Sequence, residues 1–333
     1  ENIRATIESY RFEWQTTVHA LSASIGIVMV ESDATVSALL SAADVACFAA
    51  KDMGRNQHHM YREGEAGVRH QQMHWLTRIN RALEEDRFEL YFQPIVPTSV
   101  GQTAQHCSHY ELLLRMLDEE GNIVLPSTFI AAAERYNRMP ALDRWVVSQA
   151  LEHADQGNPE EAAAYTLAIN LSGNSLSDDR FLEFIKDTLQ STPVCRGAVC
   201  FEITETAAIE NLARVRHFMS ELKKLGCLFS LDDFGSGLCS FAYLKNLPVD
   251  FLKVDGAFVR NVASDAVDKS MVSAIQNVAQ AMGIQTIAEH VEDAATQQAL
   301  AELDIPLVQG FHIAKPASIR QFAPWAAQVS VQA

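Results

Sequence analysis

Short apolar runs that each end in a polar or charged side chain recur along the second half of the chain. In the clearest case Leu231 is followed by two adjacent carboxylates, Asp232 and Asp233, and then by Phe234 and a Gly-Ser-Gly turn at residues 235–237. Other runs end at the following residues: Asn170, Glu202, Lys253, Glu289 and Gln309. Helical stretches separate the runs, so the pattern predicts alternating strands and helices. Such strands close into a (β/α) barrel whose C-terminal strand ends form one face, and we expect the functional site there.

The first part of the chain has a different organisation. Residues 22–30 have the pattern of a strand, and the apolar face of residues 36–53 predicts a helix. The polar stretch at residues 62–67 has the composition of a linker, and a long predicted helix follows it. We therefore expect two domains, one at residues 1–66 and one at residues 67–333.

Composition and charge narrow the possible function classes. The chain has 333 residues, of which 48% are hydrophobic and 20% charged, and its formal net charge is −16. This charge argues against binding to bulk nucleic acid, which needs a basic surface. A small anionic ligand remains possible if divalent cations screen the repulsion. No apolar run is long enough to cross a bilayer, so we expect no membrane contact by this segment.

Two further features bear on the cellular setting. The chain begins at Glu1 without an initiator methionine, so we expect a segment of a longer polypeptide whose other parts could include a membrane anchor. The six cysteines contain no CxxC pair, which favours free thiols in a reducing compartment. We therefore expect a cytoplasmic location.

The side chains at the predicted strand ends favour a metal site. Glu111 ends a further apolar run and adds a carboxylate to those of Glu202 and Asp232. Unpaired carboxylates at the end of a buried strand are unfavourable unless a cation neutralises them. Oxygen donors without cysteine or clustered histidine suit Mg²⁺ or Mn²⁺, and two such ions can activate water to hydrolyse a phosphodiester. Lys253 either assists that reaction or only balances the carboxylates.

Seven ordered segments resemble the EAL-domain family. They are YELLLRM at residues 110–116, INLSGNSL at 169–176, FEITET at 201–206, LDDFGSG at 231–237, LPVDFLKVDGAFV at 247–259, AEHVE at 288–292 and QGFHIAKP at 309–316. The likeness extends over residues 68–324, and so many motifs in order make it specific. The resemblance implies a modified TIM (β/α)8-type barrel in which one strand runs antiparallel. It also implies hydrolysis of cyclic di-GMP to linear 5′-pGpG, dependent on Mg²⁺ or Mn²⁺.

The same resemblance implies roles for individual residues. The metal ligands that it implies are Glu111, Asn170, Glu202, Asp232 and, for a second ion, Asp233. The residues that it connects with catalysis are Lys253, Glu289, Gln309 and Glu205. Of these, the resemblance implies that Glu289 and Gln309 hold metal-bound or attacking water and that Lys253 lies beside that water. It implies that Glu205 is not a ligand and instead tethers the loop at residues 233–237. The residues that it assigns to the dinucleotide are Gln93, Arg115 and Asp255, and an arginine suits a phosphate because its guanidinium pairs with two oxygens.

Three positions depart from the pattern of the family. Leu112 replaces alanine within the signature triplet, and His290 replaces the usual glycine after Glu289. Leu238 stands where an aromatic side chain is common. None of these changes removes an implied metal ligand. Leu112 and His290 bear on local packing and rate, whereas Leu238 lies in a loop that in this family couples dimerisation to activity.

Residues 1–66 resemble a different family. SASIGIVMV at residues 22–30 and SAADVACFAAKDMGRN at residues 41–56 are similar to the C-terminal third of a GGDEF diguanylate cyclase domain, the usual tandem partner of an EAL domain. The resemblance implies an N-terminal α/β fragment of a GGDEF domain without its signature. Lys51 and Arg55 match positions near the triphosphate in intact cyclases, and in this fragment we expect solvated charges and no cyclase activity.

Two function classes compete for the second domain. One is a metal-dependent cyclic di-GMP phosphodiesterase, and the other is a catalytically silent receptor that binds the same dinucleotide. The complete set of implied acids favours the enzyme, because a receptor can lose metal-binding acids and still hold its ligand. A scaffold that uses the barrel only for partner contacts ranks last, since it leaves the polar strand ends unexplained. The resemblance also suggests a homodimer formed through residues 67–333.

Overall fold

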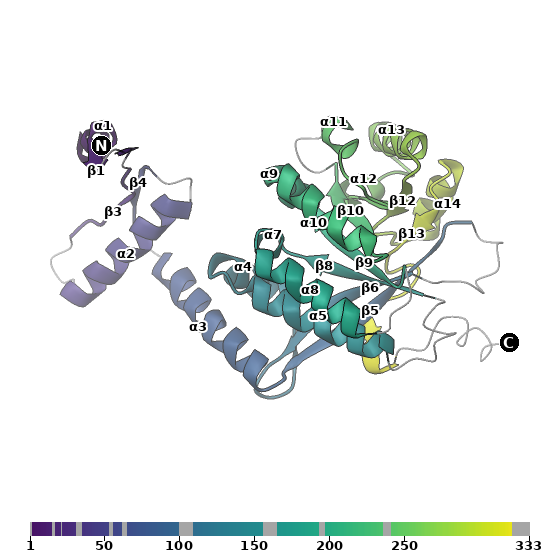
Figure 1. Ribbon diagram of the computed structural model, residues 1–333, viewed down its shortest axis with the longest axis horizontal. Helices are drawn as coiled ribbons and strands as arrows, with labels where there is room; N and C mark the ends of the chain where they lie inside the picture. Colours follow the sequence, from purple (N-terminus) through teal and green to yellow (C-terminus); the bar gives the residue numbers. More distant parts are fainter. Residues whose placement is uncertain are drawn as a thin grey trace. The chain divides into compact units, whose positions relative to one another are not determined.

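The chain divides into two compact units, Glu1–Ile79 and Asn80–Ala333. The computed structural model drawn in Figure 1 describes residues 2–14, 17–20, 22–30, 35–52, 56–61, 65–99, 109–155, 165–192, 197–235 and 241–321. Helix α3 (Glu65–Glu84) begins in the first unit and ends in the second. The predicted domain boundary after residue 66 falls near the start of α3, and the assignment of the domains stays a prediction.

The first unit contains small sheets and helices. Its helices before α3 are α1 (Asn2–Ser9) and α2 (Val36–Asp52), and its strands are β1 (Arg11–Trp14), β2 (Thr17–Ala20), β3 (Ile25–Ile27) and β4 (His58–Met60). β1 pairs with β2 in antiparallel fashion, whereas β3 and β4 are parallel. A Cβ atom on Gly26 would lie 2.3 Å from the backbone of Ala43, so glycine is what lets α2 approach β3. α2 confirms the helix predicted at residues 36–53, and β3 is only the centre of the predicted strand. The likeness to a GGDEF domain stays a prediction.

The second unit is a closed barrel. Its strands are β5 (Phe88–Pro97), β6 (His109–Leu117), β8 (Thr166–Leu171), β9 (Val199–Thr204), β10 (Leu228–Phe234), β11 (Phe251–Val254), β12 (Gln285–Ala288) and β13 (Leu307–Val308). They follow one another in the order β5-β13-β12-β11-β10-β9-β8-β6, and pairing of β6 with β5 closes the sheet. β5 is antiparallel to both of its neighbours, and the remaining neighbours in this ring are parallel. The predicted barrel with one antiparallel strand is therefore confirmed.

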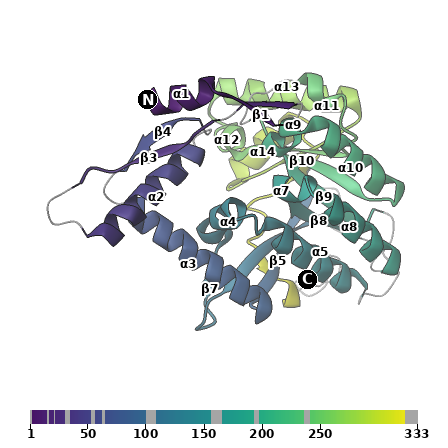
Figure 2. The same ribbon diagram turned by 60° about the vertical axis from the view of Figure 1, so that its left-hand side comes forward.

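Helices cover the outside of the barrel, as Figure 2 shows for α5, α8 and α10. Helices on the outside of the barrel include α5 (Met139–Asp155), α8 (Asp179–Ser191), α10 (Leu212–Lys224), α13 (Ala266–Met282) and α14 (Ala294–Glu302). Short helices follow four of the strands, namely α7 (Gly173–Leu176), α9 (Glu205–Glu210), α11 (Phe241–Leu244) and α12 (Gly256–Val259). The remaining elements are α4 (Pro126–Arg135), β7 (Ile123–Val124), β14 (Ala317–Ser318) and the 3₁₀ helix η2 (Ile319–Gln321). β7 and β14 extend the sheet beside β6 and β5.

Local sequence signals explain where the outer helices begin and end. Asp178, Asp265 and Asp293 precede α8, α13 and α14, and each carboxylate accepts a hydrogen bond from a backbone N–H in the first turn. Aspartate at this position satisfies donors that the helix itself leaves free. α13 ends at Gly283, whose φ of 73° lies in the left-handed region that glycine adopts without strain. These caps set where α8, α13 and α14 begin and where α13 ends.

The apolar core lies between the strands and these helices. β9 is buried at every position from Val199 to Ile203. Strands that are covered on both faces carry such near-continuous hydrophobic runs. Leu112, the substitution in the signature triplet, belongs to this core and is buried. The core therefore accommodates leucine where the family has alanine.

The described residues bear on two predictions made from the composition, the absence of a membrane span and the presence of free thiols. In those residues, no helix combines the length and the apolar character that a membrane span requires. Cys47, Cys200 and Cys227 are free thiols, as predicted. The other three cysteines lie outside the described residues.

Candidate active site

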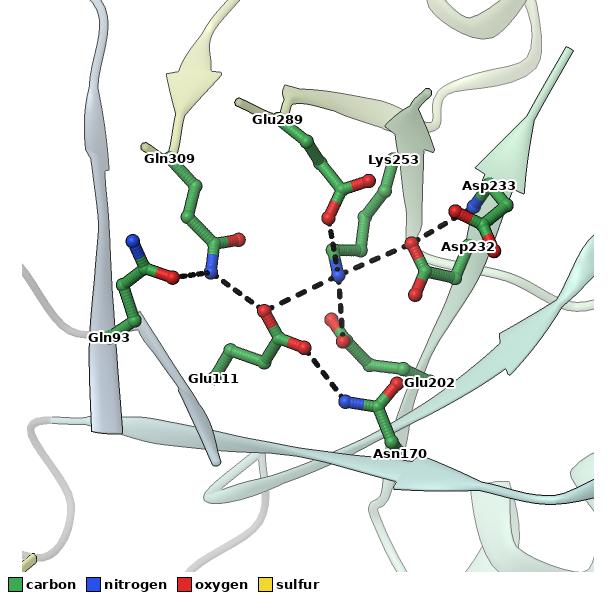
Figure 3. Close-up of polar contacts among 9 residues, drawn as sticks. All are labelled: Gln93, Glu111, Asn170, Glu202, Asp232, Asp233, Lys253, Glu289 and Gln309. Carbon is green, nitrogen blue, oxygen red and sulfur yellow. Dashed lines mark hydrogen bonds and ion pairs between the residues drawn. The ribbon is translucent and has the colours of Figure 1, made fainter. Parts of the chain in front are cut away.

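Lys253 occupies the centre of a buried polar cluster at the strand ends (Figure 3). Its side chain, on β11, is only 1% exposed. The Nζ atom lies 2.9 Å from a carboxylate oxygen of Glu202 and 2.9 Å from one of Glu289. The corresponding distances are 3.2 Å to Asp232 and 3.6 Å to Glu111. One lysine thus contacts four carboxylates that come from four different strands or strand ends.

Glu111 links this cluster to a row of amide side chains. Asn170 donates a 2.7 Å hydrogen bond to Oε1 of Glu111, and Gln309 donates one of 2.6 Å to Oε2. The same amide nitrogen of Gln309 also contacts Oε1 of Gln93 at 3.1 Å. Burial alone would raise the pKa of Glu111, but the charge of Lys253 and these hydrogen bonds outweigh it and lower that pKa. Glu111 is therefore held in its ionised form.

Asp232 and Asp233 lie on an irregularity of β10. The register between β10 and β11 shifts between Leu231 and Phe234, and Asp233 has a left-handed φ of 54°. Adjacent residues of a regular strand point to opposite faces, and a bulge changes that direction. Here oxygen atoms of both aspartates and of Glu289 lie within 4.8 Å of one another. The bulge explains how two neighbouring residues contribute to one site.

The charges of the cluster are poorly balanced. Burial raises the pKa of Glu202 well above its ordinary value, and it raises that of Glu289 to about 8. Burial and the neighbouring Asp232 also raise the pKa of Asp233. Burial would lower the pKa of Lys253, but the surrounding carboxylates raise it well above its usual range. Lys253 is therefore charged, and one positive charge does not neutralise all of these acids.

Two orphaned atoms bear on metal binding. Oε1 of Glu202 and Oε1 of Gln309 are buried, and neither has a hydrogen-bond partner among the described residues. A buried carboxylate oxygen without a partner is unfavourable unless a cation or a water contacts it. The cluster offers oxygen donors only, and such donors suit Mg²⁺ or Mn²⁺. The residues present therefore fit divalent ions of this kind.

Glu205 is not part of the cluster around Lys253, and it ties down the end of β10. One of its carboxylate oxygens accepts a 3.1 Å hydrogen bond from the backbone N–H of Gly235, and the other accepts one of 2.6 Å from the hydroxyl of Tyr243. Gly235 follows the strand that carries Asp233. This geometry agrees with the tether implied for Glu205, although residues 236–240 of the loop lie outside the described residues. Leu238 belongs to that segment, and Arg55 of the first unit also lies outside the described residues.

The three residues assigned to the dinucleotide have different surroundings. Gln93 belongs to the amide row described above. Arg115 lies four residues beyond Glu111 on the same face of β6, with its guanidinium 5.2 Å from the ring of Tyr91. In the described part of the chain no carboxylate pairs with it. Asp255 caps α12 by accepting a 2.6 Å hydrogen bond from the N–H of Ala257, so its assignment to the substrate stays a prediction.

A buried carboxylate that the sequence did not reveal holds the loop after Asn170. Oδ2 of Asp143, on α5, accepts hydrogen bonds from the hydroxyls of Ser172 and Ser175 at 2.6 Å each, and from the N–H of Ser172 at 3.1 Å. Burial raises the pKa of Asp143 to about 6. The sequence analysis also did not single out Tyr91, whose ring contacts Arg115, or Tyr243, whose hydroxyl contacts Glu205. The two-residue spacing between Tyr91 and Gln93 on one strand was the available signal for Tyr91, and nothing in the sequence singled out the other two.

The fold and the site define a TIM-barrel-like protein that gathers acidic side chains at its strand ends. The model of the EAL domain matches residues 76–316, and the chain belongs to this family.

Relatives of known name and structure are similar to this chain. The cyclic di-GMP phosphodiesterase PdeB of Shewanella oneidensis is 41% identical over 286 residues, which cover 85% of this chain and 33% of PdeB. The solved structure of the PaMucR phosphodiesterase in complex with c-di-GMP is 27% identical with a TM-score of 0.68, covering 74% of this chain and 99% of that chain. The FimX EAL domain from Pseudomonas aeruginosa, bound to c-di-GMP, is 26% identical with a TM-score of 0.67, and the match covers 73% of this chain and 96% of that chain. The chain spans about a third of the length of PdeB.

Proposed function

We propose that this chain hydrolyses cyclic di-GMP to linear 5′-pGpG and thereby ends signalling by this second messenger. The observation that carries the proposal is the convergence of acidic side chains on one buried lysine at the strand ends of an EAL-family barrel. Those acids are Glu111, Glu202, Asp232 and Glu289, and Asp233 lies beside Asp232 and Glu289. The names of its relatives support the choice of substrate, since a phosphodiesterase for cyclic di-GMP is 41% identical over most of this chain.

Divalent ions belong to this proposal as cofactors, Mg²⁺ or Mn²⁺, with two ions as the expected number. The residues that would hold the first ion are Glu111, Asn170, Glu202 and Asp232, and Asp233 would serve the second. Bound ions would supply an activated water and would neutralise charge on the phosphodiester. The unpartnered Oε1 atom of Glu202 supports this assignment, because it leaves a buried acceptor for a cation.

The remaining residues act on the water and on the phosphoryl group. The water oxygen attacks phosphorus, the bond from phosphorus to a ribose 3′ oxygen breaks, and a proton of the water passes to that oxygen. The product therefore carries a 5′-phosphate and a free 3′-hydroxyl. We assign Glu289 and Gln309 to holding the water, and the unpartnered Oε1 of Gln309 supports that role. Lys253 lies beside them and stabilises negative charge that develops on the phosphoryl oxygens.

Gln93, Arg115 and Asp255 are the proposed contacts to the dinucleotide. Arg115 supports this most directly, because its guanidinium is half-buried and, among the described residues, forms no ion pair with a carboxylate. A phosphate oxygen pair is the ligand that suits a planar guanidinium. Gln93 reaches the same face through its contact with Gln309.

Product analysis with the purified chain tests the proposal. Incubation of cyclic di-GMP with Mn²⁺ should give 5′-pGpG on chromatography, and addition of EDTA should stop its formation. Glu202→Gln removes a buried negative charge with little change of shape, and we expect it to abolish turnover. Near-normal turnover in this variant would refute the metal assignment. Binding of cyclic di-GMP without any product would instead identify the chain as a receptor.

The wider setting is also part of the proposal. We infer that residues 67–333 form a homodimer and that the protein acts in the cytoplasm. We also infer that residues 1–66 are the C-terminal part of a GGDEF domain without cyclase activity. Sedimentation of the purified chain tests the dimer, and formation of cyclic di-GMP from GTP would refute the last inference.

A further inference from the structure

Two loops at the C-terminal face of the barrel are joined by backbone hydrogen bonds and form one rim. The first follows β12 and contains His290 and Val291, and the second follows β13 and contains Gly310 and Phe311. The N–H of Val291 donates to the carbonyl of Gln309 at 3.0 Å, and the carbonyl of Val291 accepts from the N–H of the residue after Phe311 at 3.0 Å. A Cβ atom on Gly310 would lie 2.1 Å from the Val291 carbonyl oxygen. The two loops are therefore in direct backbone contact.

His290 occupies this rim in an unfavourable conformation. Its φ of 53° lies in the left-handed region, which glycine adopts easily and other residues adopt at an energetic cost. The ring lies directly against Gly256, since a Cβ atom there would be 2.3 Å from Cδ2 of His290. The side chain is nevertheless exposed, so burial of the ring does not explain why the position holds a histidine. A strained residue at an active-site rim is a reason to look for a function.

Phe311 extends from the same rim into solvent. It is 61% exposed, although it follows Gln309 of the buried cluster by only two residues. The backbone hydrogen bonds of the rim flank it on both sides, at Gln309 and at the residue after Phe311. Phe311 and His290 line one cavity of about 230 Å³, together with Glu111, Glu289 and Gln309 of the acidic cluster. Two flat rings thus stand at the mouth of a pocket whose floor carries the proposed catalytic groups.

We propose that His290 and Phe311 form a subsite that binds one purine base of the substrate by stacking. The inference rests on the proposed function, because it assigns a part of that substrate to a part of the pocket. Flat aromatic side chains are the usual platforms for nucleobases, and each stacked base contributes about 1–3 kcal/mol as judged by replacement with alanine. Binding of this kind is made equally in the ground state and the transition state, so it lowers KM and leaves kcat nearly unchanged.

His290→Gly is the first test, because glycine accepts the left-handed backbone without strain. The melting temperature of the variant should equal or exceed that of the wild type. In contrast, KM for cyclic di-GMP with Mn²⁺ should rise by roughly 5- to 150-fold, the range that loss of one stacked base predicts. His290→Phe keeps a flat ring and should restore most of the lost affinity. A KM unchanged in His290→Gly would overturn the assignment of this residue.

Phe311→Ala is the second test, and Val267→Ala is its matched control. Val267, on α13, is an exposed apolar residue of the same unit and does not line the cavity. We expect Phe311→Ala to raise KM within the same range and Val267→Ala to leave it unchanged. Calorimetric titration with Mn²⁺ alone should give equal affinities for all variants, and weaker Mn²⁺ binding would overturn the stacking role by assigning the effect to the ions.

The outcomes separate this inference from the proposed function. A wild-type chain that does not hydrolyse cyclic di-GMP would refute the proposed function and the subsite together. A wild-type chain that hydrolyses it, with KM unchanged in both Phe311→Ala and His290→Gly, would refute the subsite alone.

Discussion

Replacement of Lys253 by methionine tests whether one buried lysine stabilises the whole acidic cluster. Lys253→Met keeps a long unbranched side chain and removes the ammonium group that lies 2.9 Å from both Glu202 and Glu289. The lysine is almost completely buried, so water does not screen these contacts. The perturbation therefore leaves buried carboxylates without their nearest positive charge.

The size of the effect follows from the geometry. At an effective dielectric constant of about 20, one pair of charges at this distance is worth roughly 6 kcal/mol of Coulomb energy, and desolvation of the buried groups offsets most of it. Removal of one partner from a buried ion pair typically costs about 3–5 kcal/mol, because it strands the other charge. We expect Lys253→Met to lower the free energy of unfolding by this amount at about pH 8 without divalent ions.

The loss should depend on pH. Burial raises the pKa of Glu202 and of Glu289, and the charge of Lys253 counteracts both shifts, so its removal raises these values further. A carboxyl group whose pKa is raised by folding contributes stability that is present at low pH and is lost as the pH rises through the folded pKa. The difference between wild type and Lys253→Met should therefore be smaller near about pH 5 than above about pH 8, because protonation relieves the stranded charges.

Urea unfolding of the full chain in EDTA, followed by circular dichroism, measures this difference. The matched control is Lys223→Met, since Nζ of Lys223 lies 2.6 Å from Asp250 but the pair is partly exposed, at 30% and 28%. Its removal should cost about 1 kcal/mol or less. Added Mn²⁺ should restore part of the stability lost in Lys253→Met only. A Lys253→Met chain as stable as the wild type at high pH, or one whose loss does not vary with pH, would contradict the assigned role.

Two further predictions concern residues that hold the site from outside. Gly235→Ala should lower stability by about 1–3 kcal/mol and slow hydrolysis, because φ is 105° and the added Cβ would lie 2.7 Å from the ring of Phe258. A melting temperature and a rate equal to those of the wild type would count against it. Burial raises the pKa of Asp143 to about 6, so its contribution to stability is complete below about pH 4 and is lost as the pH rises through about 6. That decline in the free energy of unfolding is worth about 3 kcal/mol. Asparagine does not titrate, so Asp143→Asn should remove the decline. Curves of stability against pH that run parallel for the wild type and Asp143→Asn would refute the assignment to Asp143.

The sequence predicted the site through the ends of its strands. Lys253 and Glu202 each follow an apolar run, and the parallel strands of a barrel end on one face. The proximity of polar residues at those positions can therefore be predicted without knowing the structure of the loops. The structure brings Glu111, Asn170 and Gln309 to the same face, as expected. That one strand runs antiparallel came from the family resemblance alone, because hydrophobic periodicity carries no information on strand direction. The structure shows that this strand is β5.

Contacts between distant segments were not predictable in this way. The bulge at Asp233 depends on how β10 pairs with β11, and the sequence shows only two adjacent acids. Asp143 lies on a helix, and most aspartates on helices are exposed, so the sequence alone does not show that this one is buried. Only the structure shows its contacts with Ser172 and Ser175. Tyr243 is similar, since its contact with Glu205 joins residues 38 positions apart. Long-range hydrogen bonds of this kind follow from the closed barrel and from no local pattern.

Hydrogen bonds outside the cluster counteract repulsion inside it. Carboxylates that share one lysine repel one another. In addition, Asp233 and His290 have left-handed backbones at the ends of β10 and β12, and these strands lie on either side of the strand that carries Lys253. Nothing in the charges themselves would keep these two strand ends in place. The hydrogen bond from Gly235 to Glu205 restrains the first, and the backbone bond from Val291 to Gln309 restrains the second. Glu205 and Val291, which lie outside the cluster around Lys253, therefore restrain the two strand ends on which the proposed chemistry depends.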